Sequence, residues 1–174
     1  MTKQIIITGA LERGKTTLCG QLAMLAREAG WEVRGVLSPA VFAAGRKVGI
    51  DLVNLSSGER RPLAHRDRPA DGVRTERWNF IKEATEWGNT ILSASAPCDL
   101  LIVDELGPLE LVRGEGLLSG LTAIDGDNYC LAVVVIRPAL LKIALERWPA
   151  TEVVEISAPE QADQLAVRIL DKLP

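Results

Sequence analysis

A glycine-bounded segment carries the clearest chemical signal in this sequence. Residues 9–17 contain the pattern G-x-x-x-x-G-K-T, and the run before them, residues 5–7, is three isoleucines. A strand, a loop of this spacing and the start of a helix form a cradle whose backbone N–H groups bind phosphate. The sequence therefore predicts a nucleotide-binding loop. Its candidate nucleotide contacts are Gly9, Ala10, Leu11, Glu12, Arg13, Gly14, Lys15, Thr16 and Thr17.

Two side chains of this loop have chemistry of their own. The ammonium group of Lys15 can reach the β- and γ-phosphates, and the hydroxyl group of Thr16 can be a ligand of Mg²⁺. A lone ammonium there stabilises both the bound nucleotide and the transition state, so Lys15 is also a candidate catalytic residue. The alternative is an ordinary glycine-containing turn, which the strand before it and the helix after it disfavour.

A second candidate segment ends in two carboxylates. Residues 100–105 read Leu-Leu-Ile-Val-Asp-Glu, and four apolar residues in a row indicate a strand buried on both faces of a parallel sheet. Open α/β sheets bind their ligands at the carboxyl edge, where this pair would lie. Asp104 can hold Mg²⁺ through its water shell, and Glu105 can orient and deprotonate an attacking water. By itself the pair also suits a solvated turn.

Arginines supply the remaining candidate charges. Arg137 follows an apolar strand, so it should lie at the same edge as Asp104 and either sense the γ-phosphate or pair with a local carboxylate. The segment 60–77 either forms a solvated rim or contributes one arginine as a finger over the phosphates. Its arginines are Arg60, Arg61, Arg66, Arg68, Arg74 and Arg77. The tryptophans, at positions 31, 78, 87 and 148, are expected to be core or helix-packing residues; Trp78, next to these arginines, is the one most suited to stack on a base instead.

The elements that position these residues alternate along the chain. Strands are expected at residues 3–8, 33–37, 130–136 and 153–156 and before Asp104, and residues 40–66 read as β-hairpins. Helices are expected at residues 15–29, 79–96, 138–148 and 157–173, and from 108 to about 124. Two glycines at 114–116 could break the helix from 108 to 124. The helix at 157–173 would begin with a capping box formed by Ser157 and Glu160. This order predicts an α/β fold of the P-loop NTPase kind: a mainly parallel central sheet, helices on both faces, and a β-hairpin insertion at about residues 40–77.

Composition limits the classes of protein that remain. The 174 residues, 47% hydrophobic and 25% charged, suit one domain, residues 1–174. A net charge of −3 predicts no clear nucleic-acid surface. We see no membrane-spanning stretch and no leader pattern. Three distant cysteines predict buried thiols in a cytoplasmic protein rather than a disulfide framework or metal cluster. The sequence does not indicate the oligomeric state.

The chain resembles the THEP1-type nucleoside triphosphatases, small phosphate-loop proteins. The segments that carry the resemblance are residues 9–17, 35–39 with 45–63, 104–111 and 129–173. The most diagnostic is Asp-Glu-Leu-Gly-Pro-Leu-Glu-Leu at 104–111, a close variant of the family's Asp-Glu-Ile-Gly-Pro-Met-Glu-Leu. The resemblance implies hydrolysis of nucleoside triphosphates, ATP, GTP or others, to diphosphate and phosphate, with Mg²⁺ and loose choice of base.

The resemblance also bears on single residues. It gives Lys15, Thr16, Asp104 and Glu105 the roles described above, and it makes Gly107 a candidate nucleotide contact. Glu110 matches a family position, where it either orients Glu105 or braces the loop; a helix-N-terminal acid stabilised by the dipole is the plain alternative.

The interior of the phosphate loop, residues 10–13, departs from the family, which usually has Pro and Gly there. Side chains that point outward would leave the backbone cradle intact. Arg13 either touches a phosphate or neutralises Glu12.

Two other functions remain open at this point. A small-molecule or nucleotide kinase would bind the same nucleotide with Mg²⁺, and residues 40–77 could serve as its lid. The Asp104–Glu105 pair favours hydrolysis, since Glu105 is well placed to activate water. A nucleotide-dependent adaptor resembling the GTP-binding proteins of molybdopterin assembly is the other alternative. The chain lacks an Asn-Lys-x-Asp guanine motif, which argues against a dedicated GTPase.

Overall fold

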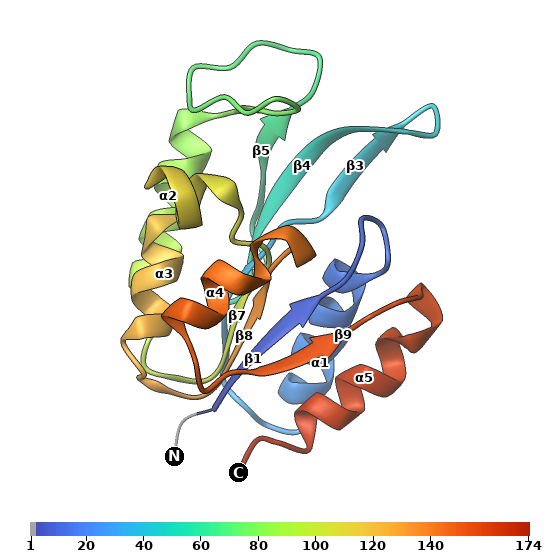
Figure 1. Ribbon diagram of the computed structural model, residues 1–174, viewed down its shortest axis with the longest axis vertical. Coiled ribbons are helices and arrows are strands. Elements are labelled where there is room, and N and C mark those ends of the chain that lie inside the picture. Colours follow the sequence, from blue (N-terminus) through green and yellow to red (C-terminus); the bar gives the residue numbers. More distant parts are fainter. Residues whose placement is uncertain (1–2) are drawn as a thin grey trace.

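The central sheet runs through the whole molecule (Figure 1). The computed structural model describes residues 3–174. The sheet has hydrogen-bonded order β6-β5-β4-β2-β7-β8-β1-β9, with β3 paired to β4. Its parallel strands are β1 (Lys3–Thr8), β2 (Val33–Leu37), β7 (Cys98–Val103), β8 (Tyr129–Val135) and β9 (Glu152–Glu155). Its antiparallel strands are β3 (Ala40–Ala43), β4 (Arg46–Asn54), β5 (Arg60–His65) and β6 (Asn79–Phe80).

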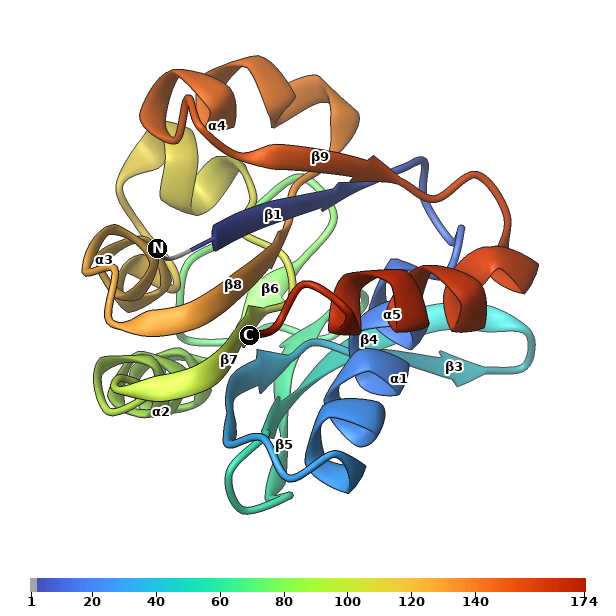
Figure 2. The ribbon, with the colours of Figure 1, turned by 90° about the horizontal axis from the view of Figure 1, so that it is seen from below.

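Helices cover both faces of the parallel strands (Figure 2). One face packs against α1 (Lys15–Glu28) and α5 (Ala162–Leu170), and the other against α2 (Lys82–Ser93), α3 (Leu118–Asp125) and α4 (Leu141–Arg147). The apolar runs of the central strands explain this arrangement, because successive side chains point to opposite faces and each needs cover. Ile5 and Ile7 accordingly pack with the first group, and Ile6 with the second. The predicted α/β fold is confirmed.

The register of the parallel strands aligns their carboxyl ends. Val103 of β7 lies opposite Val134 of β8, and Ile7 of β1 lies opposite Val135. The residues that follow these strands, which include Asp104 and Arg137, therefore emerge at one edge. This is the edge at which open α/β sheets bind ligands.

The hairpin segment extends the sheet beyond β2. Strands β3, β4 and β5 arise from residues 40–66 as expected, and β4 pairs antiparallel with β2. In Figure 1 the β3–β4 hairpin projects as an arm from this side of the molecule. That residues 1–174 form one domain, with about residues 40–77 as its insertion, stays a prediction.

Several predicted helix boundaries are wrong. Residues 79–80 form β6, because their backbone pairs with β5, and α2 ends at Ser93 rather than at 96. The region from 108 to 124 is broken as suggested, into a π-helical turn, η1 (Leu109–Arg113), and α3. Short 3₁₀ turns, η2 (Pro138–Leu140) and η3 (Pro159–Gln161), precede α4 and α5.

The predicted capping box at Ser157 and Glu160 is also wrong. The side-chain oxygen of Gln161 accepts the backbone N–H groups of Ser157 (2.8 Å) and Ala158 (3.3 Å). A carboxamide at the end of the 3₁₀ turn therefore satisfies the free backbone donors that precede α5.

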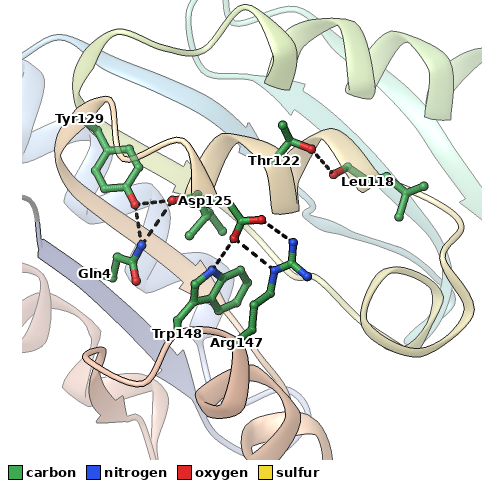
Figure 3. A network of polar contacts seen from close by, with 8 residues as sticks. Gln4, Leu118, Thr122, Asp125, Tyr129, Arg147 and Trp148 are labelled. Carbon is green, nitrogen blue, oxygen red and sulfur yellow. Dashed lines mark hydrogen bonds and ion pairs between the residues drawn. The ribbon is translucent and has the colours of Figure 1, made fainter.

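The amino edge of the sheet is closed by a polar network (Figure 3). Asp125 accepts hydrogen bonds from Arg147 (Nε, 3.1 Å) and from the indole N–H of Trp148 (2.9 Å). Gln4 of β1 donates to the hydroxyl group of Tyr129 (2.7 Å). These hydrogen bonds tie the start of β1 to β8 and the end of α3 to the end of α4.

Candidate active site

The phosphate loop joins β1 to α1, and two of its residues must be glycine. A Cβ atom on Gly9 would lie 2.3 Å from the carbonyl oxygen of Ile156. Gly14, the residue before α1, has a left-handed backbone with φ of 92°, a conformation that side chains disfavour. The close approach of Ile156 thus requires glycine at position 9, and the left-handed backbone favours it at position 14. The side chains of residues 10–13 are exposed, which leaves the inside of the loop to backbone groups.

Lys15 folds back over this loop. Its ammonium group donates to the carbonyl oxygens of Gly9 (2.7 Å) and Ala10 (2.6 Å). Burial lowers its pKa from the usual value, an effect opposed by the charge of Glu105 and reinforced by that of Arg137. The cation therefore lies at the mouth of the loop, within reach of a phosphate bound there.

Asp104 is a buried carboxylate on which several segments converge. Its side chain is 2% exposed, and Oδ2 accepts the backbone N–H of Ser38 at 2.9 Å. The Thr16 side chain also hydrogen-bonds to it. Burial raises the pKa of Asp104 to about 6, although the bonds from Ser38 and Thr16 act in the opposite direction. The Thr16 hydroxyl and this carboxylate form a pair of hard oxygen donors beside the phosphate loop.

Glu105 and Arg137 form an ion pair at the end of β7 and β8. Arg137 Nε donates to Glu105 Oε1, and both side chains are partly exposed. Glu105 has φ of +70°, a left-handed conformation that turns the chain sharply after Asp104. Non-glycine residues seldom adopt it, and such conformations are often found at functional sites. The structure places Arg137 beside a local carboxylate, one of the two alternatives that the sequence allowed.

Glu110 braces the segment that carries Glu105. The Glu110 side chain accepts the backbone N–H groups of Gly107 (2.8 Å, Oε2) and Leu117 (2.8 Å, Oε1), and the residue is 9% exposed. Burial raises its pKa, and the two backbone bonds oppose that rise. A Cβ atom on Gly116 would lie 2.3 Å from Oε1, so the carboxylate fills the space that this glycine leaves. Of the alternatives for Glu110, bracing of the loop fits these contacts.

The arginines of residues 60–77 form a rim. Arg60 pairs with Asp51 at 2.5 Å, and Arg61 pairs with Glu59 at 2.7 Å. The others are exposed: Arg66, Arg68, Arg74 and Arg77. Trp78 is buried at 8% exposure, so it is not free to stack on a base.

The β3–β4 hairpin also brings Lys47 to the site, a residue that no motif of the sequence singles out. Its ammonium interacts electrostatically with Glu105, Arg137, Glu12 and Asp104. Burial lowers its pKa, while the charge of Glu105 acts in the opposite direction. A lysine in a strand of the insertion gave no local signal, because only the fold of the hairpin brings its charge near Glu105, Asp104 and Glu12. The sequence indicated only that successive side chains of this strand alternate between its two faces.

A β-strand, a phosphate loop closed by glycines, a helix and an acidic pair at the sheet edge together define a P-loop nucleotide-binding protein. A family model described as NTPase matches residues 4–170, so the chain belongs to this family of nucleoside triphosphatases. Relatives named nucleoside-triphosphatase THEP1 include those of Methanopyrus kandleri and Methanothermobacter thermautotrophicus. Both are 30% identical, over 176 and 172 residues respectively, and each alignment covers 98% of this chain and 95% of the relative.

Two solved structures are similar in fold. The solution structure of a human cancer-related nucleoside triphosphatase has a TM-score of 0.73 at 22% identity, covering 98% of this chain and 96% of that one. The crystal structure of THEP1 from Aquifex aeolicus has a TM-score of 0.67 at 21% identity, covering 98% of both chains. Within residues 3–174, no helix is long and apolar enough to cross a membrane.

The brace formed by Glu110 leads to the first prediction. Glu110→Gln keeps the shape but turns an NH₂ group toward one of the two backbone donors, which then loses its acceptor. We expect a loss of about 1–3 kcal/mol in the free energy of unfolding, measured by urea denaturation. We also expect a lower rate of nucleotide hydrolysis, because the Glu105 segment loses its anchor.

The matched control is Glu86→Gln, a change of the same chemistry at an exposed position of α2. Glu86→Gln should alter neither the free energy of unfolding nor the rate of nucleotide hydrolysis. If Glu110→Gln behaved like this control, the carboxylate would not be the brace.

Proposed function

We propose that the protein hydrolyses nucleoside 5′-triphosphates to diphosphate and phosphate, with Mg²⁺ and little discrimination between bases. The observation that carries the proposal is the position of Glu105, next to the buried Asp104 and at the edge that the phosphate loop occupies. The names of the relatives support the same reaction, and the loose choice of base rests on the family resemblance alone.

Nucleotide binding would use the loop, the dipole of α1 and Lys15. The backbone N–H groups of residues 9–17 face the phosphates, and the positive end of α1 adds to their field. Lys15 exchanges the carbonyl oxygens of Gly9 and Ala10 for the β- and γ-phosphates. Because the transition state gathers charge on the same oxygens, this interaction assists the reaction as well as binding. Gly107, buried at the foot of the Glu105 turn, is proposed as a further nucleotide contact.

The donor set at Thr16 and Asp104 fits Mg²⁺, which prefers oxygen ligands and keeps several waters. Thr16 would bind it through its hydroxyl, and Asp104 directly or through water. When bound, the ion neutralises charge on the phosphate oxygens. The hydrogen bond from Ser38 holds the Asp104 carboxylate in place for this purpose.

Glu105 would act as the general base, and Arg137 as the sensor of the γ-phosphate. Glu105 accepts the proton of the attacking water, which general-base catalysis requires to lie within hydrogen-bond reach. Arg137, now paired with Glu105, lies where its guanidinium can turn to the γ-phosphate and stabilise its developing charge. The partial exposure of both side chains leaves room for water and substrate.

The working context follows from the same residues. We propose that residues 1–174 act as one domain in the cytoplasm, where Cys19, Cys98 and Cys130 remain the free thiols that they are in the structure.

The metal role of Asp104 gives the second prediction. Asp104→Asn should raise the Mg²⁺ concentration that gives half-maximal activity, because a neutral amide holds the hydrated cation less well. The measurement is a Mg²⁺ titration of phosphate release at saturating nucleotide. An unshifted midpoint would contradict the assignment of Asp104. Asp99→Asn is the control: this residue belongs to the same strand but accepts the N–H of Glu32 at the opposite end.

The third prediction concerns Glu105. Glu105→Gln keeps the shape and removes the proton acceptor, so turnover should fall by about 10²–10⁴. Nucleotide affinity should stay nearly unchanged, since the loop amides and Lys15 do not need the Glu105 charge. Single-turnover phosphate release and equilibrium binding, measured on the same samples, separate the two effects.

Three outcomes would contradict the proposal or a part of it. Hydrolysis by Glu105→Gln at close to the parent rate would mean that water is activated elsewhere. A parent protein that releases phosphate only when an acceptor is supplied would be a kinase. Very slow turnover together with a stable partner complex would instead favour the adaptor function.

A further inference from the structure

Lys47 is a cation that the phosphate-loop motifs do not account for. It lies in β4, on the insertion hairpin, and is partly buried. Its register partner in β3 is Phe42. Its charge interacts with the charges of Lys15, Arg137, Glu105 and Asp104. These four residues come from three other segments of the chain. The hairpin therefore delivers an ammonium group to the site formed by the parallel strands.

We propose that Lys47 contacts the γ-phosphate of the bound nucleoside triphosphate and is a catalytic residue of the hydrolysis proposed above. The inference rests on that proposed function. It replaces the idea that an arginine of residues 60–77 supplies this charge.

The root of the hairpin is tied to the catalytic edge. Ser38, two residues before β3, donates its backbone N–H to Asp104 Oδ2 at 2.9 Å and its hydroxyl to the Asp104 backbone oxygen at 3.0 Å. The N–H of Asp51 in β4 bonds to the carbonyl oxygen of Pro39 at 2.9 Å. The arm that carries Lys47 is thus fixed against the end of β7, where Asp104 and Glu105 lie.

An aromatic ring supports the ammonium group. Lys47 Nζ lies 5.2 Å from the centroid of the Trp78 ring. Trp78 is itself fixed, because its backbone N–H donates to the Thr75 hydroxyl at 3.0 Å and its carbonyl accepts the N–H of Thr75 at 2.9 Å. A cation–π contact of this kind favours a charged lysine held in one place. Trp78 is therefore a positioning residue, with its ring facing a cation of the site.

Three cations of the site act on one another. Lys15, Arg137 and Lys47 repel one another, an effect on the pKa values of the two lysines that follows burial, which lowers them, and the charge of Glu105, which raises them. Partial burial strengthens such interactions relative to water. An anion that enters between the three cations relieves the repulsion, and the γ-phosphate is the group that the phosphate loop would deliver to this place. The arginines of the rim, by contrast, either pair with their own carboxylates or are exposed.

The experiment separates recognition of the third phosphate from nucleotide binding in general. Equilibrium dissociation constants for ADP and for the non-hydrolysable triphosphate AMP-PNP, each with Mg²⁺, are measured for the parent, Lys47→Met and Lys47→Arg. Arg46→Met is the matched control, because this neighbour is exposed and points to the other face of the strand. Thermal unfolding of each variant checks that the fold is retained.

We expect Lys47→Met to bind ADP like the parent and to lose the preference for AMP-PNP by about tenfold or more, with kcat falling by about 10²–10³. Lys47→Arg, which keeps the charge, should restore part of the preference for AMP-PNP and part of kcat. Arg46→Met should match the parent in every measurement. Parent-like binding of both nucleotides by Lys47→Met, or equal losses for ADP and AMP-PNP, would overturn the inference.

The measurements of nucleotide binding remain decisive for Lys47 even if the protein does not hydrolyse nucleotides. A parent protein that prefers AMP-PNP but releases no phosphate would contradict the proposed function and still test Lys47. Conversely, a parent that hydrolyses ATP while Lys47→Met hydrolyses it equally well would leave the proposed function intact and remove Lys47 from it.

Discussion

The buried carboxylate of Asp104 joins the three segments from which the candidate site is assembled. It directly follows β7, it receives the hydrogen bond of Thr16 at the start of α1, and it accepts the backbone N–H of Ser38 at the root of the hairpin. A buried carboxylate without such partners would be costly, so each bond stabilises the position of the segment that supplies it. The phosphate loop, the acidic pair and the insertion thus meet at this one group.

Two cations near Asp104 have partners within the chain. Lys15 donates to carbonyl oxygens of its own loop, and Arg137 pairs with Glu105. Each of these two cations therefore has a partner of its own, which lowers the cost of holding its charge in a partly buried site.

Much of this could be predicted from the sequence because the signals were local. A few neighbouring residues are enough to predict the loop at residues 9–17, the apolar strand before Asp104 and the strand before Arg137. A parallel sheet then brings the ends of these segments together. The parts that failed depend on distant contacts. Asn79 and Phe80 form a strand only because β5 lies beside them, and Gln161 rather than Ser157 caps the turn before α5 because its carboxamide reaches back. Lys47 could not be recognised, since its place follows from the path of a whole hairpin and from the ring of Trp78.

We infer that a nucleoside triphosphate binds at the phosphate loop with Lys15 on its phosphates and is hydrolysed there. The most direct test compares phosphate release from ATP, GTP, CTP and UTP by the parent protein and by Lys15→Ala, with no acceptor added. We expect the parent to act on all four nucleotides and the variant to be slower by about 100-fold, on the order of 3 kcal/mol of transition-state stabilisation. Unchanged hydrolysis by Lys15→Ala would contradict the claim.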